Sequence, residues 1–120
     1  MNKINENIWI GNSNDATNKP LLKSAGITAI LNCAFDLKDH FQYPEFVIAH
    51  CGLIDGPGNQ WEHYLSAYTQ LSALIESNHK VLVHCHKGES RSVTIVMMHL
   101  DSKDRKGWDY WRAFIKSHRD

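Results

Sequence analysis

The stretch that most constrains the fold is residues 80–92, which read Lys-Val-Leu-Val-His-Cys-His-Lys-Gly-Glu-Ser-Arg-Ser. Val81–His84 is rich in β-branched and apolar side chains and predicts a buried strand, and Cys85 follows directly where that strand ends. Arg91 then opens an apolar run over residues 93–100 that is long enough for a buried helix. A strand, a tight loop and a helix start in this order predict an anion cradle, built from backbone N–H groups and the helix N-terminus.

The side chains at this predicted cradle indicate chemistry on a phosphoryl group. Cys85 should be a thiolate near neutral pH, because a helix N-terminus and nearby cations lower the pKa of a thiol. Arg91 carries a planar fork of donors that can bind two phosphate oxygens at once. A thiolate, an anion cradle and a bidentate arginine together favour nucleophilic attack on phosphorus.

The same residues carry a family resemblance. Cys85-x5-Arg91, with His84 before it and Ser92 after it, resembles the signature of the cysteine-dependent phosphatases, and the local form is similar to the small dual-specificity branch. This resemblance implies a protein tyrosine phosphatase-like fold. It also implies a hydrolase that dephosphorylates phosphotyrosine and phosphoserine or phosphothreonine proteins through a cysteinyl-phosphate intermediate, without a metal or cofactor.

The resemblance also implies roles for the neighbouring residues. Ser92 would donate a hydrogen bond to the cysteine sulfur and help it leave, although a serine at a helix start can equally satisfy a free N–H group. His84 would be a buried residue that orders the loop through backbone hydrogen bonds. The residues expected to bind phosphate, mainly through backbone N–H groups, are His86, Lys87, Gly88, Glu89, Ser90 and Arg91.

Hydrolysis also needs a proton donor for the leaving oxygen, and Asp55 is the candidate. It lies in a Gly/Pro-rich loop after a predicted strand, in the Leu-Ile-Asp context that resembles the family's general acid. Aspartate before glycine often only begins a turn, which is the alternative for Asp55 alone. Asp36 and Asp39, on an earlier loop, are weaker competitors.

The remaining cysteines and histidines allow two further interpretations. Cys33 ends a predicted strand and is similar in placement to the second cysteine that forms a reversible disulfide with the nucleophile in some relatives; the favoured alternative is a small buried hydrophobe. Cys51 is interpreted only as such a hydrophobe. A zinc site built from His84, Cys85 and neighbouring His and Cys residues is disfavoured, because its spacing matches no common zinc pattern.

Length and pattern predict a single α/β domain over residues 1–120, with a mainly parallel sheet flanked by helices. We expect strands near residues 4–10, 27–33 and 46–49 and a helix over residues 60–77. A first helix capped by Asn14 or Asp15 should be interrupted at Pro20 and end at Gly26, with a last helix after Gly107. Helical spacing predicts that Trp61, Trp108 and Trp111 are core residues.

The composition restricts which partners and which compartment can be expected for the chain. With 13 basic and 13 acidic residues the chain has no net charge, which makes nucleic acid an unexpected partner. An odd number of cysteines suits a reducing compartment, and no run is long enough to span a membrane. We expect a cytoplasmic monomer that acts on phosphoproteins. RNA 5′-phosphates or phosphoinositides as substrates, and a non-catalytic phosphate-binding pseudophosphatase, remain the alternatives.

Overall fold

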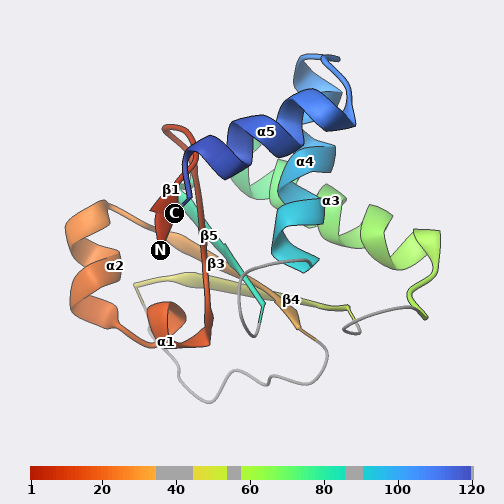
Figure 1. Ribbon diagram of the computed structural model, residues 1–120. Coiled ribbons are helices and arrows are strands. Elements are labelled where there is room, and N and C mark those ends of the chain that lie inside the picture. The colour runs from red at the N-terminus through yellow and green to blue at the C-terminus, as the bar shows by residue number, and fades with distance from the viewer. Residues whose placement is uncertain (35–44, 54–57, 86–90, 120) are drawn as a thin grey trace.

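The computed structural model describes residues 1–34, 45–53, 58–85 and 91–119 (Figure 1). Pairs of strands and a pair of helices make up the first part of the chain, and single strands and helices alternate from residue 47 to residue 103. The elements are β1 (Asn2–Lys3), β2 (Ile8–Gly11), α1 (Ser13–Ala16), α2 (Lys19–Ala25), β3 (Ala29–Ala34), β4 (Val47–Leu53), α3 (Trp61–Glu76), β5 (Val81–His84), α4 (Arg91–Lys103) and α5 (Trp108–Ser117).

The strands form one five-stranded sheet in the order β1-β2-β5-β3-β4. β5 is therefore the middle strand, and it pairs in parallel with β2 on one side and β3 on the other. β3 and β4 are also parallel, whereas the short β1 pairs antiparallel with β2. The mainly parallel sheet predicted from the sequence is confirmed.

Helices cover both faces of this sheet, with α1 and α2 on one side and α3, α4 and α5 on the other (Figure 1). Along β5, Val81 and Val83 pack in the core under α3–α5, whereas Leu82 packs in a second core with Leu22 of α2. This alternation follows from the two-residue side-chain period of a strand, and it explains why a strand buried on both faces is apolar throughout. No helix in the described part of the chain is long and apolar enough to cross a membrane.

The first helical segment is split in two, as Pro20 predicts. Pro20 lies in the first turn of α2, where a missing N–H group costs nothing, and the Asn18 side chain caps that helix. Gly26 ends α2 with φ of 80°, the left-handed conformation typical of a helix terminator. The predicted cap of α1 was wrong, because Asn12 caps that helix and Asp15 returns the hydrogen bond in a capping box.

The prediction that three tryptophans lie in the core was correct for only one of them. Trp111 is buried and 7% exposed, but Trp61 is 62% and Trp108 is 44% exposed. Helical spacing places a residue on a face of its helix, but it does not tell how far the neighbouring elements cover that face. α3 buries Ala67 and Leu71 fully, whereas its first turn, with Trp61, is left open to solvent.

α3 and α4 are also joined by one polar contact. The Ser72 hydroxyl on α3 lies 2.9 Å from Nδ1 of His99 on α4, which is only 5% exposed. Burial lowers the pKa of His99, and the positive charge of Lys103 acts in the same direction, while Glu76 opposes it. The folded protein therefore holds His99 in its neutral form more strongly than the unfolded chain does.

We predict that His99 makes the fold sensitive to acid. A histidine with a lowered folded-state pKa binds its proton better in the unfolded chain, so its contribution to stability is lost as the pH falls below about 6.5. Urea unfolding between pH 5 and 8 should show the free energy of unfolding declining on the acid side. His99→Gln should make the free energy of unfolding depend less on pH in this range. The control His118→Gln, at the exposed end of α5, should leave the pH dependence unchanged. An unchanged slope in His99→Gln would contradict the assignment.

Candidate active site

The candidate nucleophile lies at the carboxyl end of the central strand. Cys85 follows β5 directly and extends the side-chain face of Val81 and Val83, so its thiol packs in the core beneath α4. It is 2% exposed. In parallel α/β sheets the carboxyl ends of the strands are where ligands bind, and Cys85 lies at that edge.

The first turn of α4 brings two of the predicted residues to this edge. The Ser92 hydroxyl, which is fully buried, lies 3.5 Å from the Cys85 sulfur. The Arg91 side chain is 4% exposed, and its Nη1 donates a hydrogen bond of 2.9 Å to the backbone carbonyl of Leu53 at the end of β4. A hydroxyl beside the sulfur and a buried guanidinium next to it can stabilise a negative charge at this place.

Several predicted site residues lie outside the described residues. These are Asp55, its competitors Asp36 and Asp39, and the loop residues His86, Lys87, Gly88, Glu89 and Ser90. Leu53 is the described residue that precedes Asp55 most closely, and its carbonyl is the acceptor for Arg91.

His84 and Cys33 are both buried close to Cys85. His84 is 1% exposed at the last position of β5. Cys33, on β3, is completely buried, and its pKa is raised well above its usual value. The largest cause is a hydrogen bond with the Cys51 side chain, followed by burial, while the charge of Arg91 acts in the opposite direction.

Two contacts of the site were not predicted from the sequence. One is the hydrogen bond from Arg91 to Leu53, because a backbone acceptor leaves no signal in residue type. The other is Cys51, which was interpreted only as a buried hydrophobe but contacts Cys33 and donates from its sulfur to the Asn32 carbonyl at 3.4 Å. The signal that could have found it is the alignment of β3 and β4, which places a cysteine near the end of each strand.

No metal centre is found in the part of the chain that the structure describes, where no three His, Cys, Asp or Glu side chains are grouped to hold an ion.

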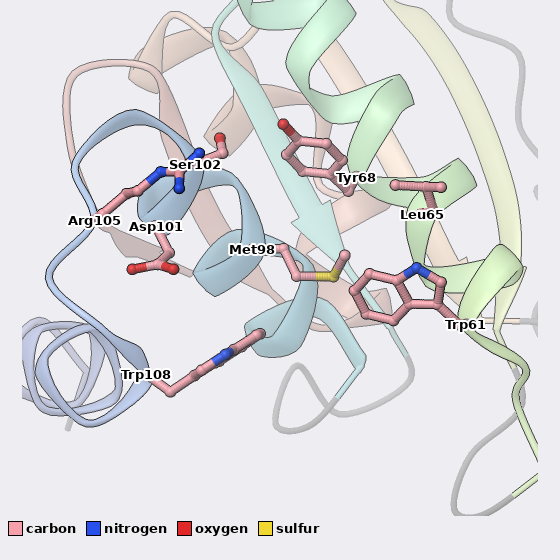
Figure 2. A pocket seen from close by; sticks show the side chains of 8 residues that line it. All are labelled: Trp61, Leu65, Tyr68, Met98, Asp101, Ser102, Arg105 and Trp108. Carbon is pink, nitrogen blue, oxygen red and sulfur yellow. The ribbon is translucent and has the colours of Figure 1, made fainter.

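A hollow lies between α3, α4 and the start of α5 (Figure 2). Its volume is about 290 Å³, and Met98 lies between the two exposed tryptophans, Trp61 and Trp108. The other lining residues are Leu65, Tyr68, Asp101, Ser102 and Arg105. None of the predicted site residues that the structure describes is among its lining residues.

The chain is similar in sequence to phosphatases. Residues 8–120 match the family described as "Dual specificity phosphatase, catalytic domain". Dual specificity protein phosphatase 1B of Arabidopsis thaliana is 34% identical over 121 residues, which cover 99% of this chain and 71% of the relative. Human dual specificity protein phosphatase 4 is 30% identical over 93% of this chain, but only 28% of that longer protein is matched.

Solved structures share the fold. The human tyrosine phosphatase-like serine/threonine/tyrosine-interacting protein matches with a TM-score of 0.84 and 23% identity, covering 99% of this chain and 83% of that one. Human DUSP28 matches with a TM-score of 0.84 and 20% identity over the same shares of the two chains. At these identities the likeness extends to the fold alone.

We predict that Arg91 is the main binding group for an oxyanion at this site. Arg91→Lys keeps the charge but loses the second donor of the fork, and a hydrogen bond to a charged group contributes about 1.5–3 kcal/mol. Calorimetric titration with inorganic phosphate should therefore show affinity weakened roughly 10- to 100-fold. Arg112→Lys, an exposed change on α5, is the matched control. Equal phosphate affinity in the two variants would show that Arg91 does not bind the anion.

Proposed function

The chain belongs to the dual specificity phosphatases, a family of cysteine-dependent protein phosphatases, and from this we propose that it hydrolyses phosphate monoesters on phosphoproteins through a cysteinyl-phosphate. The observation that carries the proposal is the meeting of three side chains at one sheet edge. Cys85 ends the central strand, Ser92 lies 3.5 Å from its sulfur, and the Arg91 guanidinium is held by the Leu53 carbonyl. Phosphotyrosine and phosphoserine or phosphothreonine are the proposed substrates.

The first step is attack of the Cys85 thiolate on phosphorus, which breaks the bond to the leaving oxygen. Arg91 and the backbone N–H groups of residues 86–90 hold the three equatorial oxygens, where charge is spread in the transition state. Asp55 protonates the leaving oxygen, so that an alcohol rather than an alkoxide departs. Each group acts on charge that develops during the step, which is what lowers the barrier.

The second step hydrolyses the cysteinyl-phosphate. Asp55, now a carboxylate, takes a proton from water, and the oxygen attacks phosphorus while the sulfur leaves. Ser92 donates a hydrogen bond to the departing thiolate, and its 3.5 Å distance from the sulfur supports this role. The hydrogen bond from Arg91 to the Leu53 carbonyl supports the role of Asp55, because it ties the strand that leads to Asp55 to the arginine.

We expect Cys85→Ser to abolish turnover. Hydrolysis of p-nitrophenyl phosphate between pH 5 and 8, with EDTA present, should be retained by the wild type and absent in the serine variant, because an alkoxide is not available at these pH values. The variant should still bind phosphopeptide. Activity in Cys85→Ser, or loss of wild-type activity in EDTA, would contradict the cysteine mechanism. A folded, reduced wild type without activity would favour the phosphate-binding pseudophosphatase.

We expect Asp55→Asn to discriminate between leaving groups. In a phosphoserine peptide the leaving group is the serine oxygen, a strong base that must be protonated as it departs. The kcat of Asp55→Asn on such peptides should therefore fall by about 10²–10⁴, the usual contribution of general acid catalysis. p-Nitrophenyl phosphate, whose leaving group is a weak base, should slow far less. Asp36→Asn is the matched control and should slow neither substrate. Parallel assays on RNA 5′-phosphates and phosphoinositides identify the substrate class, and preference for either would overturn the phosphoprotein assignment.

A further inference from the structure

All three cysteines of the chain lie in one row across the sheet. In the parallel register Asn32 of β3 is opposite His84 of β5, so the next residues, Cys33 and Cys85, are also neighbours. On the other side Asn32 is opposite His50 of β4, which brings Cys51 beside Cys33. The order Cys51, Cys33, Cys85 therefore follows the strand order β4-β3-β5.

The three thiols also share one face of the sheet. Cys33 and Cys85 belong to the core cluster under α3–α5, and Cys51 packs against that cluster. Cys33 lies between Cys51 and Cys85 in the register of the three strands, and both neighbouring cysteines act to raise its pKa. Neighbouring strands are about 4.8 Å apart, which is within the Cα separation of about 4.4–6.8 Å that a disulfide requires.

A β-bulge lies at this row, directly after Cys51. The register of β3 and β4 shifts between Asn32 and Ala34, so that both Cys51 and Gly52 are opposite the single residue Cys33. Gly52 has φ of 62°, a backbone conformation that other residues rarely adopt. The regular register up to Asn32 and His50 already places Cys51 opposite Cys33, and the bulge ends that regular pairing directly after the two thiols. The pairing is thus built into the backbone.

We propose that Cys51 is the terminal thiol of a three-cysteine relay, which returns Cys85 to the reduced form after one oxidation by a hydroperoxide. The proposal rests on the proposed function, since it takes Cys85 as the reactive thiolate. It goes beyond a disulfide between Cys33 and Cys85, because that bond is an intermediate and the stable product is the Cys33–Cys51 disulfide.

The chemistry has three steps. The Cys85 thiolate attacks the hydroperoxide, the O–O bond breaks, and a sulfenic acid and an alcohol (or water) form. The Cys33 sulfur then displaces hydroxide from that sulfenic acid, so a disulfide forms and water leaves with the thiol proton. Finally the Cys51 thiolate attacks the Cys33 sulfur, the bond to Cys85 breaks, and Cys85 departs as a thiolate. The two electrons taken by the hydroperoxide come from Cys33 and Cys51.

The direction of the last step follows from the leaving groups. In thiol–disulfide exchange the sulfur that is most stable as a thiolate leaves fastest. The Ser92 hydroxyl, 3.5 Å from the Cys85 sulfur, can donate to a thiolate there, whereas the Cys51 side chain and burial raise the pKa of Cys33 although the charge of Arg91 opposes them. Exchange therefore expels Cys85 and keeps Cys33 in the disulfide.

The test is a titration of the reduced full-length protein with hydrogen peroxide, without added thiol. Free thiols are then blocked with N-ethylmaleimide, and disulfides are mapped by mass spectrometry. The wild type should keep most of its p-nitrophenyl phosphate activity through the first equivalent, while a Cys33–Cys51 disulfide accumulates. Further peroxide should inactivate it irreversibly, because Cys33 is no longer able to protect Cys85. Accumulation of a Cys33–Cys85 disulfide in the wild type would overturn the relay.

Two substitutions of Cys51 remove the last step. Cys51→Ala and Cys51→Ser should have wild-type activity before oxidation, and the serine keeps a donor for the Asn32 carbonyl if the alanine folds poorly. In both, the first equivalent of peroxide should trap the Cys33–Cys85 disulfide and abolish most activity, and dithiothreitol should restore it. Wild-type resistance to peroxide in both variants would overturn the role of Cys51.

Cys85→Ser tests which cysteine the peroxide oxidises first. Cys51 is half-buried, so peroxide could reach it directly without any relay. If Cys85 is the entry point, the same dose should form far less Cys33–Cys51 disulfide in Cys85→Ser than in the wild type. An equal amount would overturn the relay. Failure of the proposed function is seen separately, as absent p-nitrophenyl phosphate hydrolysis in the untreated wild type, whatever the disulfide map shows.

Discussion

The pairing of β5 between β2 and β3 is the constraint on which the rest of the structure depends. All four residues of β5 are buried, and its alternating side chains fill the core on both faces. A slip of one residue would move Val81 and Val83 to the face of Leu82 and empty one core while overfilling the other. Packing therefore fixes the register of β5, and the register in turn fixes which face receives the Cys85 sulfur.

Arg91 shows how the site is matched to an anion. A guanidinium that is almost fully buried loses its hydration, and this costs free energy unless other polar groups replace the water. The Leu53 carbonyl replaces part of it, and it also holds the side chain between the end of β4 and the start of α4. A phosphoryl group at this place would replace further hydration through charge-assisted hydrogen bonds. The same electrostatics favour a thiolate at Cys85 and a phosphoryl group beside it.

The sequence predicted what local chemistry determines and failed where tertiary packing decides. The strand at Val81–His84, the helix from Arg91 and the break at Pro20 each follow from nearby residues, and all three are found. Trp61 and Trp108 were assigned to the core from spacing alone, but whether a helix face is covered depends on elements distant in sequence. Cys51 lies beside Cys33 because of the register of β3 and β4, which pairs residues that are far apart in the sequence. Asp55 lies outside the described residues, so its role stays a prediction.

The surroundings of Cys33 affect both its charge state and its use as a second thiol beside Cys85. A second thiolate next to Cys85 would oppose the negative charge of the nucleophile, because like charges disfavour each other's ionised form. The Cys51 side chain and, after it, burial raise the pKa of Cys33, which favours its neutral thiol form. Packing alone would be met equally well by alanine or valine at this position, and the sheet already uses both at neighbouring positions. A neutral thiol at Cys33 therefore does not oppose the negative charge of Cys85. It also places a sulfur on the strand next to the nucleophile.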